Sequence, residues 1–194
     1  MIVEQFLSLD GVAQAPGASE EDTSDGFRHG GWHMQFMDEP AQQRVLQGIV
    51  DAGGFLLGRR TYEIFAGYWP HASGEEQVIA EPLNTKPKYV ASTTLSEPLD
   101  WQNSTVLGGD LEKAVTELKQ QDGGHLHVSG STRLVQWLFE RGLVDEFRLM
   151  IDPVVVGGGK RLFRDDGALR QLRLVDSLVT PAGAIFATYV PAGA

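Results

Sequence analysis

The sequence contains no cysteine, which sets the first limit on what its 194 residues can do. Disulfide bonds, thiol nucleophiles and cysteine metal sites are therefore excluded. The chain also has no uninterrupted run of about 18 apolar residues, so a membrane-spanning helix is not expected. No basic leader opens the sequence, and Glu4 lies within the first segment. We therefore expect an unprocessed cytoplasmic protein.

Basic residues are scarce, with 16 lysines and arginines against 26 aspartates and glutamates, for a net charge of −10. Nucleic acids and anionic membranes reward clustered positive charge, so neither is expected as a partner. Against this acidic background the adjacent Arg59 and Arg60 indicate a local anion site. A plain surface pair bonded to acidic neighbours is the alternative.

Two widespread nucleotide-binding motifs are absent. The chain has no G-x-G-x-x-G fingerprint and no complete P-loop. Residues 157–160 read GGGK, but the preceding glycine of the P-loop is missing and Arg161 replaces its hydroxyl residue. The sequence therefore supports neither a Rossmann dehydrogenase nor a P-loop NTPase.

Strand and helix patterns alternate through the first three quarters of the chain, after which strands close it. A polar, glycine-containing loop is expected over residues 11–31. Strands are predicted over residues 2–9, 55–57, 88–93, 104–107, 125–130 and 146–156, with a β-hairpin over 169–191. Helices are predicted over residues 41–50, from Thr61, from Asp110 and from Ser131. This order predicts one α/β domain over residues 1–194, with a mostly parallel central sheet flanked by helices and a C-terminal antiparallel hairpin.

Glycine, hydroxyl and arginine residues follow three of these predicted strands. They are Gly58 to Thr61, Ser92 and Thr93, and Ser129 to Thr132. Open α/β sheets bind ligands at the carboxyl ends of their strands, and the start of a helix favours phosphate. Taken singly, each group has a simpler interpretation; Ser131, for example, is also placed to cap a helix. Together they fit a single dinucleotide better than coincidence.

Several motifs, in their order along the chain, resemble the dihydrofolate reductase superfamily. They are SLDGVA (8–13), FLLGRRTYE (55–63), YVAST (89–93), HVSGST (127–132) and LVDEFRLMIDPVVVGGGKRLF (143–163). Within that superfamily the chain is most similar to stand-alone relatives of the reductase domain of the bifunctional riboflavin-biosynthesis deaminase-reductase. The resemblance covers nearly the whole chain. It implies a dihydrofolate reductase-like fold and an NADPH-dependent reductase.

The resemblance also implies which residues contact each part of NADPH. The 2′-phosphate is assigned to Arg59 and Arg60, beside Ser92 and Thr93. The pyrophosphate is assigned to Thr61 and the turn formed by Ser129, Gly130, Ser131 and Thr132, and Gly58 is a further cofactor-binding residue before the helix. The nicotinamide border is assigned to Leu9 and Gly11, with the 11–31 loop as a lid. A phosphate dianion suits two arginines, whereas a ribose hydroxyl favours a carboxylate. Asp10 is the acid nearest the expected nicotinamide, and two interpretations are open. It is either a catalytic residue that orients the substrate or relays a proton, or part of a plain Asp-Gly turn.

The implied substrate is a small heterocycle, similar to 5-amino-6-(5-phosphoribosylamino)uracil. Gln42 and Gln43 stand where dihydrofolate reductases carry a carboxylate, which disfavours folate. The chain also has Tyr62-Glu63 in place of the Asp-Asp-Pro element of riboflavin-pathway reductases. The alternatives are a dihydrofolate or pterin reductase, a non-catalytic NADPH-binding protein, and a structural protein whose glycine turns are only turns. Long late strands such as 147–156 predict a homodimer.

Two histidine pairs are candidates for metal ligands. His29 and His33 have helical i, i+4 spacing, and His125 and His127 share one face of a predicted strand. Neither pair has a third ligand of metal type nearby in the sequence, so no metal site is predicted. Trp32, together with Phe36 and Trp69, predicts either a flat aromatic pocket or ordinary core packing.

Overall fold

The computed structural model describes residues 1–193 and shows one α/β domain. Its strands are β1 (Ile2–Ser8), β2 (Gly54–Gly58), β3 (Lys88–Ala91), β4 (Ser104–Leu107), β5 (Leu126–Ser129), β6 (Glu146–Asp152), β7 (Leu172–Val179) and β8 (Ile185–Pro191). Its α-helices are α1 (Glu39–Asp51), α2 (Arg59–Tyr68), α3 (Gln77–Thr85), α4 (Leu111–Lys119) and α5 (Thr132–Glu140).

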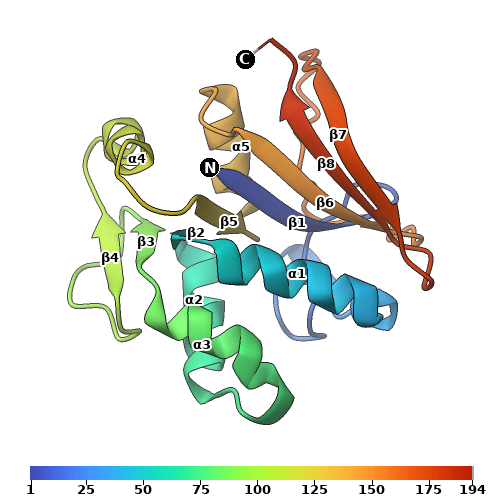
Figure 1. Cartoon of the computed structure of the whole chain (residues 1–194), viewed down its shortest axis with the longest axis horizontal. Coiled ribbons are helices and arrows are strands. Elements are labelled where there is room, and N and C mark those ends of the chain that lie inside the picture. Colours follow the sequence, from blue (N-terminus) through green and yellow to red (C-terminus); the bar gives the residue numbers. More distant parts are fainter. Residues whose placement is uncertain (194) are drawn as a thin grey trace.

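All eight strands form one sheet in the order β4-β3-β2-β5-β1-β6-β8-β7. The strands from β4 to β6 are parallel, whereas β8 pairs antiparallel with both β6 and β7. Figure 1 shows the β7–β8 hairpin at one end of the sheet and β4 at the other. The predicted fold class is therefore confirmed, including the terminal antiparallel hairpin.

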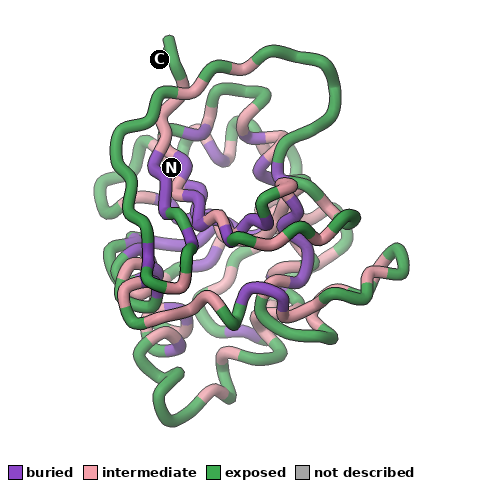
Figure 2. The backbone as a smooth tube through the Cα atoms, turned by 90° about the vertical axis from the view of Figure 1, so that its right-hand side faces the viewer, coloured by how far each residue is buried: buried purple, intermediate pink, exposed green. Residues whose placement is uncertain are grey.

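The strand β1 lies inside the sheet, between β5 and β6. Its side chains alternate between two apolar layers, because successive residues of a strand point to opposite faces. Val3 and Leu7 join the layer that packs on α4 and α5, whereas Phe6 faces the layer that packs on α1, α2 and α3. Figure 2 shows these buried segments gathered in the middle of the molecule. Helices therefore cover both faces of the sheet, as a parallel sheet requires.

Helix starts follow the sequence signals closely. The Asp38 side chain accepts a hydrogen bond from the Ala41 N–H, and Asp110 does the same for the Lys113 N–H. Both aspartates are therefore N-caps, as their positions predict. Pro40 lies in the first turn of α1, where its missing N–H needs no partner.

Several predicted boundaries differ from those in the structure by one to four residues, and one helix was missed. The helix α2 begins at Arg59, two residues before the predicted Thr61, because Gly58 is its N-cap. The strand β6 ends at Asp152 rather than at residue 156, because Pro153 follows and has no N–H for the ladder. The strand β3 ends at Ala91 rather than at residue 93. No helix was predicted over α3, whose interior Pro82 argues against one.

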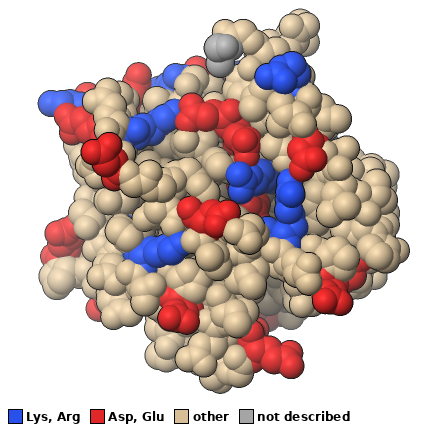
Figure 3. Space-filling view, viewed as in Figure 1, with Lys and Arg blue, Asp and Glu red and all other residues tan. Residues whose placement is uncertain are grey.

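Charged side chains of both signs are interspersed on the surface. Figure 3 shows lysines and arginines lying next to aspartates and glutamates over one face of the molecule. Ion pairs such as Arg44 with Asp176 and Arg141 with Glu112 account for part of this pattern. Within residues 1–193, no helix combines the length and the apolar character needed to cross a membrane.

Candidate functional site

The carboxyl ends of β1, β2, β3 and β5 meet at one edge of the sheet, because these strands are parallel. Two helices begin at the ends of β2 and β5. The helix α2 follows β2 directly, and α5 follows β5 after the turn at Gly130 and Ser131. Their first N–H groups and the positive ends of their dipoles are therefore directed at the same region.

Hydrogen bonds join the two helix starts to each other. The Gly58 N–H donates to the Ser131 Oγ at 2.9 Å, and the Ser131 Oγ lies 2.9 Å from the Thr61 Oγ1. The Ser131 N–H also donates to the Thr61 Oγ1, at 3.0 Å. Ser131 is the N-cap residue of α5, but its side chain makes no cap bond to that helix. It joins α5 to α2 instead, which fixes the distance between the two helix starts.

Gly130 allows the backbone to pass close to Thr61 in this turn. Its φ is +60°, in the left-handed region that favours glycine. A Cβ atom at this position would lie 3.1 Å from both the Cγ2 and the Oγ1 of Thr61. The turn therefore presents bare backbone at the edge of the sheet. We call the group formed by Gly58, Thr61, Gly130 and Ser131 the cradle.

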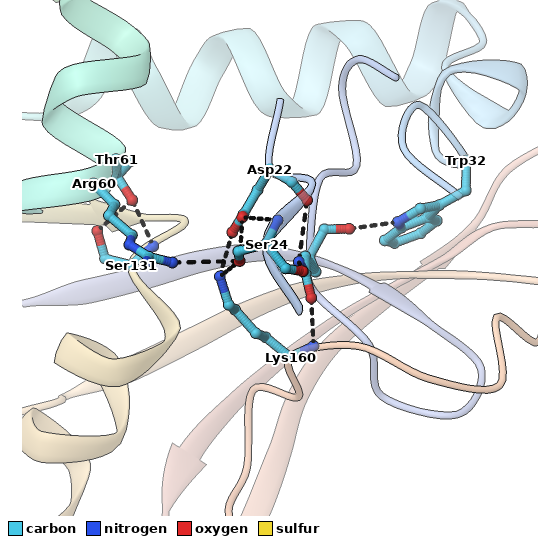
Figure 4. A network of polar contacts seen from close by, with 8 residues as sticks. Asp22, Ser24, Trp32, Arg60, Thr61, Ser131 and Lys160 are labelled. Atoms are coloured by element: carbon cyan, nitrogen blue, oxygen red, sulfur yellow. Dashed lines mark hydrogen bonds and ion pairs between the residues drawn. The ribbon is translucent and has the colours of Figure 1, made fainter. Parts of the chain in front are cut away.

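Two cationic side chains from distant parts of the chain converge beside the cradle (Figure 4). The Arg60 Nη1 donates to the Ser24 Oγ at 3.3 Å, and the Lys160 Nζ donates to the same oxygen at 2.6 Å. The Lys160 ammonium also pairs with the Asp22 carboxylate. Burial raises the pKa of Asp22, but hydrogen bonds from Lys160 and Ser24 outweigh it and leave this pKa below its usual value. Asp22 therefore supplies the negative charge beside these cations.

Gln14 bonds the loop that carries Asp22 and Ser24 to the segment that carries Lys160, and so holds the loop at this edge of the sheet. The Gln14 Oε1 accepts from the Lys160 N–H at 3.0 Å, and its Nε2 donates to the carbonyls of Asp22 and Ser24 at 3.0 and 3.1 Å. The Trp32 Nε1 donates to the Gln14 carbonyl at 2.8 Å. The predicted 11–31 loop is thus a compact segment packed in front of the cradle.

The structure brings together only some of the residues predicted for the cofactor. Gly58, Thr61, Gly130 and Ser131 are in contact, and Arg60 lies beside them. Ser129 ends β5 and Thr132 begins α5 at the same edge. Arg59 is turned aside, because both oxygens of Glu63 accept from its Nη1 at 2.9 Å.

Ser92 and Thr93 follow β3, the strand next to β2. The Ser92 Oγ accepts hydrogen bonds from the N–H groups of Thr94 and Leu95, at 3.1 and 2.9 Å, so this side chain closes the turn after β3. Thr93 is exposed. The pair lies on the β3 side of the cradle, as predicted from its position after a strand.

At the end of β1, Leu9 is 65% exposed and Gly11 has a φ of +80°. The Asp10 carboxylate accepts from the Ser8 Oγ at 2.7 Å and from the N–H groups of Val156 and Gly157 at 3.0 and 2.9 Å. The Ser8 bond, with these backbone bonds, lowers the Asp10 pKa to about 2. At neutral pH this carboxylate is ionised and carries no proton to donate; it joins the loop after β1 to the loop after β6.

A histidine–aspartate pair lies on the other side of β1. The His33 Nδ1 and the Asp152 Oδ2 are 2.7 Å apart, and the two residues are only 1% and 0% exposed. The His33 ring stacks on Phe6, with 3.8 Å between ring centroids. His33 lies outside any helix, so its i, i+4 spacing from His29 does not place the two side chains on one face of a helix.

Lys160, Asp22, Ser24 and Gln14 were not predicted as site residues from the sequence, and neither was the pairing of His33 with Asp152. In the sequence, Lys160 stands out only as the lysine of an incomplete P-loop. Its actual partners lie more than 130 positions earlier in the chain, a separation that no local spacing reveals. The signal that was present is a single lysine after three glycines in an acidic protein.

Comparison with known proteins is consistent with this architecture. The sequence matches the RibD C-terminal domain family over residues 1–186. The uncharacterized protein YyaP of Bacillus subtilis (strain 168) is 33% identical over 136 residues, which cover 69% of this chain and 71% of YyaP.

Two solved structures show the same fold at low identity. A putative riboflavin biosynthesis protein from Shewanella sp. PV-4 superposes with a TM-score of 0.71 at 20% identity, covering 98% of each chain. A dihydrofolate reductase from Enterococcus faecalis, complexed with NADP(H) and RAB-propyl, superposes with a TM-score of 0.59 at 12% identity, covering 98% of this chain and 95% of the reductase. The chain belongs to the RibD C-terminal domain family, which is a family of reductases.

Proposed function

We propose that this protein is an NADPH-dependent reductase of a small heterocyclic substrate. The observation that carries the proposal is the meeting of two helix starts, α2 and α5, with Arg60 and Lys160 at the carboxyl edge of the sheet. Helix starts, arginine and lysine all favour phosphate oxygens. The bare backbone at Gly130 lets such a group approach closely. The residues present therefore fit the pyrophosphate of a dinucleotide.

The order of the strands suggests how the rest of the cofactor would lie. Neighbouring strands are about 4.8 Å apart, so the edge from β3 to β6 extends over roughly 20 Å. With the pyrophosphate at β2 and β5, the adenosine half is assigned to the β3 side, near Arg59, Ser92 and Thr93. The nicotinamide is assigned to the β1 side, near Leu9 and Gly11. The solved Enterococcus reductase, which shares the fold, binds NADP(H), and this supports the assignment.

The chemistry of the reaction would come from the cofactor, which supplies a hydride to a C=N or C=O carbon when bound. The protein's own residues would bind and orient. The cradle and Lys160 would hold the pyrophosphate, and the 11–31 loop would exclude water from the site.

Titration of the purified protein with NADPH and with NADH tests the cofactor assignment. We expect NADPH to bind clearly more tightly, because only NADPH carries the 2′-phosphate. Arg59→Ala and Arg60→Ala, measured separately, show which arginine makes the distinction. Arg59 must leave Glu63 to do so, so we also expect Glu63→Gln to strengthen NADPH binding slightly. Equal affinity of the wild type for both cofactors contradicts the assignment.

The substrate proposed first is an aminopyrimidine of the riboflavin-pathway type, on the strength of the family. A pterin is the second candidate, because the Enterococcus structure of the same fold is a dihydrofolate reductase. Loss of NADPH absorbance with 5-amino-6-(5-phosphoribosylamino)uracil, and separately with dihydrofolate, distinguishes the two. If the protein binds NADPH tightly but reduces neither compound, the result supports the alternative of a non-catalytic NADPH-binding protein.

We also propose that the protein forms a homodimer through β7. This strand lies at the edge of the sheet and is exposed along nearly its whole length. It carries four exposed apolar side chains, Leu174, Val175, Leu178 and Val179. The unpaired N–H and C=O groups of an exposed edge strand are a template for pairing with another chain. We expect sedimentation to show a dimer that Val179→Lys dissociates, whereas Val78→Lys on α3 leaves it intact.

A further inference from the structure

The His33–Asp152 pair contains buried polar atoms that nothing in the described structure satisfies. Within residues 1–193, the His33 Nε2 and the Asp152 Oδ1 have no hydrogen-bond partner. Both side chains are at least 98% buried. Burying unsatisfied polar atoms is unfavourable, so native proteins rarely do it without a functional reason or an ordered water.

The pair lies at the same edge of the sheet as the cradle. Asp152 is the last residue of β6 and is in register with Ser8, the last residue of β1. One residue further, the Leu9 N–H donates to the Val154 carbonyl at 2.8 Å. The strand β1 separates β6 from β5, so the pair is about two strand spacings, or roughly 10 Å, from the cradle. That is the side on which the nicotinamide is assigned.

The loop that closes over the cradle also carries His33. The His33 N–H donates to the Pro16 carbonyl at 3.2 Å, and the Gly31 N–H donates to the Ala15 carbonyl at 2.9 Å. The neighbouring Trp32 is bonded to Gln14, which in turn holds Lys160. Because His33 is only 1% exposed beneath these contacts, a substrate reaches it only when this loop moves.

The contacts of His33 fix which nitrogen is free to react. Asp152 holds the Nδ1 edge at 2.7 Å, and Phe6 stacks on one face of the ring at an interplanar angle of 17°. The imidazole therefore has one orientation, with Nε2 free. A carboxylate that orients a histidine in this way is a recurrent arrangement in acid–base catalysis. Glu21 is a further charged group near His33: burial raises the Glu21 pKa, and His33 partly opposes that rise.

Two other histidines with buried ring nitrogens, His125 and His127, do not share this position. His127 is in register with Ile2, six residues and about 20 Å along β1 from Ser8. Burial lowers the His127 pKa to about 3, so its ring is neutral near physiological pH. His125 lies just before β5, at the same far end of the sheet. Both are suited to serve as controls.

We propose that His33 contacts the substrate and donates the proton that accompanies hydride transfer, and that Asp152 positions it. The inference rests on the proposed reductase function. Hydride addition forms a C–H bond, and the π electrons of the C=N or C=O bond move to the heteroatom. A new N–H or O–H bond then forms with the proton from the His33 Nε2. The ring is left neutral, still bonded through Nδ1 to Asp152, and water returns the proton.

The first test compares His33→Gln, Asp152→Asn and the control His125→Gln. Single-turnover oxidation of NADPH is followed with 5-amino-6-(5-phosphoribosylamino)uracil and with dihydrofolate. For whichever compound reacts, we expect His33→Gln to slow hydride transfer by roughly 100-fold or more and Asp152→Asn by roughly 10-fold. His33→Gln should also flatten the pH profile of the rate. NADPH affinity should change less than about twofold, which separates this inference from failure of the cofactor assignment.

A second readout needs no turnover. The His33 ring signals, identified by their absence in His33→Gln, are followed by NMR as the compound that reacts is added to the NADP⁺ complex. We expect these signals to shift on the addition, because the proposal places the His33 Nε2 against the substrate. Ring signals that do not change overturn the proposal. An unchanged rate and pH profile in His33→Gln overturns it equally.

Discussion

The polar network beside the cradle and the His33–Asp152 pair lie at the same edge of the sheet. They differ in how far their polar groups are exposed and hydrogen-bonded. Around the cradle, Arg60, Lys160, Asp22 and Ser24 are partly exposed and satisfy one another. The His33–Asp152 pair is buried and leaves two polar atoms unsatisfied. The first arrangement allows partners to be exchanged for a ligand, whereas the second holds a single geometry.

The energies of the two arrangements differ for the same reason. Ion pairs near solvent contribute about 0–1 kcal/mol, so a phosphate can replace the Asp22 carboxylate at little cost. Removing one member of a buried pair costs about 3–5 kcal/mol, because the other member is left uncompensated. Substitutions in the two regions should therefore affect different measurements.

The largest expected effect is on folding stability, in the buried pair. Asp152→Ala should lower the free energy of unfolding by about 3 kcal/mol, since it removes the only described partner of the His33 Nδ1. Denaturant titration measures the change. The exposed Asp165→Ala is the control and should change stability by less than about 0.5 kcal/mol. A loss of that small size for Asp152→Ala would show that the buried pair is no stronger than a surface contact.

Glu4 extends the comparison to a buried carboxyl group on β1. Burial raises the Glu4 pKa from 4.5 to about 7, and Arg148 and Arg44 only partly oppose that rise. The folded state then binds more protons than the unfolded state between these two values. The free energy of unfolding should therefore fall as pH rises from about 4.5 to about 7, by at most about 3 kcal/mol, and then level off.

Glu4→Gln should remove that slope and stabilise the protein above about pH 7, where the wild type carries a buried charge. Denaturant titrations at several pH values test this. Glu117→Gln on α4, where the carboxylate is largely exposed, is the control. Parallel pH profiles for Glu4→Gln and the wild type contradict the expectation.

The next largest effect is on NADPH affinity and concerns Lys160, in the polar network beside the cradle. Lys160→Met removes an ammonium that the structure directs at Ser24 and Asp22, and we expect NADPH affinity to fall about 10-fold. Fluorescence titration of NADPH measures it. Lys113→Met, an exposed lysine on α4, makes the same chemical change away from this edge. Equal NADPH affinities in the two variants would show that Lys160 does not bind the cofactor.

The smallest effect has the opposite sign. Asp22→Asn removes the carboxylate that occupies Lys160, so NADPH affinity should rise by roughly threefold, consistent with the small energy of a partly exposed ion pair. Asp122→Asn on the exposed turn before β5 makes the same change in net charge. If both variants bind NADPH equally well, the gain comes from net charge and not from release of Lys160.

The two regions also differ in how far the sequence reveals them. Gly58, Thr61, Gly130 and Ser131 each follow a strand, so the parallel sheet alone predicts that they meet. The fold followed from the same alternation of strands and helices. Arg59 and Arg60 were assigned together from the sequence, but Arg59 pairs locally with Glu63 and only Arg60 is bonded to Ser24 beside the cradle.

Contacts between segments far apart in the chain could not be predicted from the sequence. His33 and Asp152 are 119 positions apart, and Lys160 and Asp22 are 138 positions apart. Neither pair has a spacing that any single element imposes. They meet because a loop without helices longer than a single turn folds back on the sheet, and the path of such a loop depends on tertiary contacts such as those of Gln14.

The position of β1 inside the sheet has a consequence for biosynthesis. Residues 2–8 are translated before every other strand of the sheet, yet both of their neighbours, β5 and β6, are encoded beyond residue 125. Pairings so far apart in sequence form slowly, and a nascent chain exposes both sides of β1 until most of it has been translated. The middle of the sheet is therefore completed late in translation, and chains released before β5 is made should be prone to aggregate.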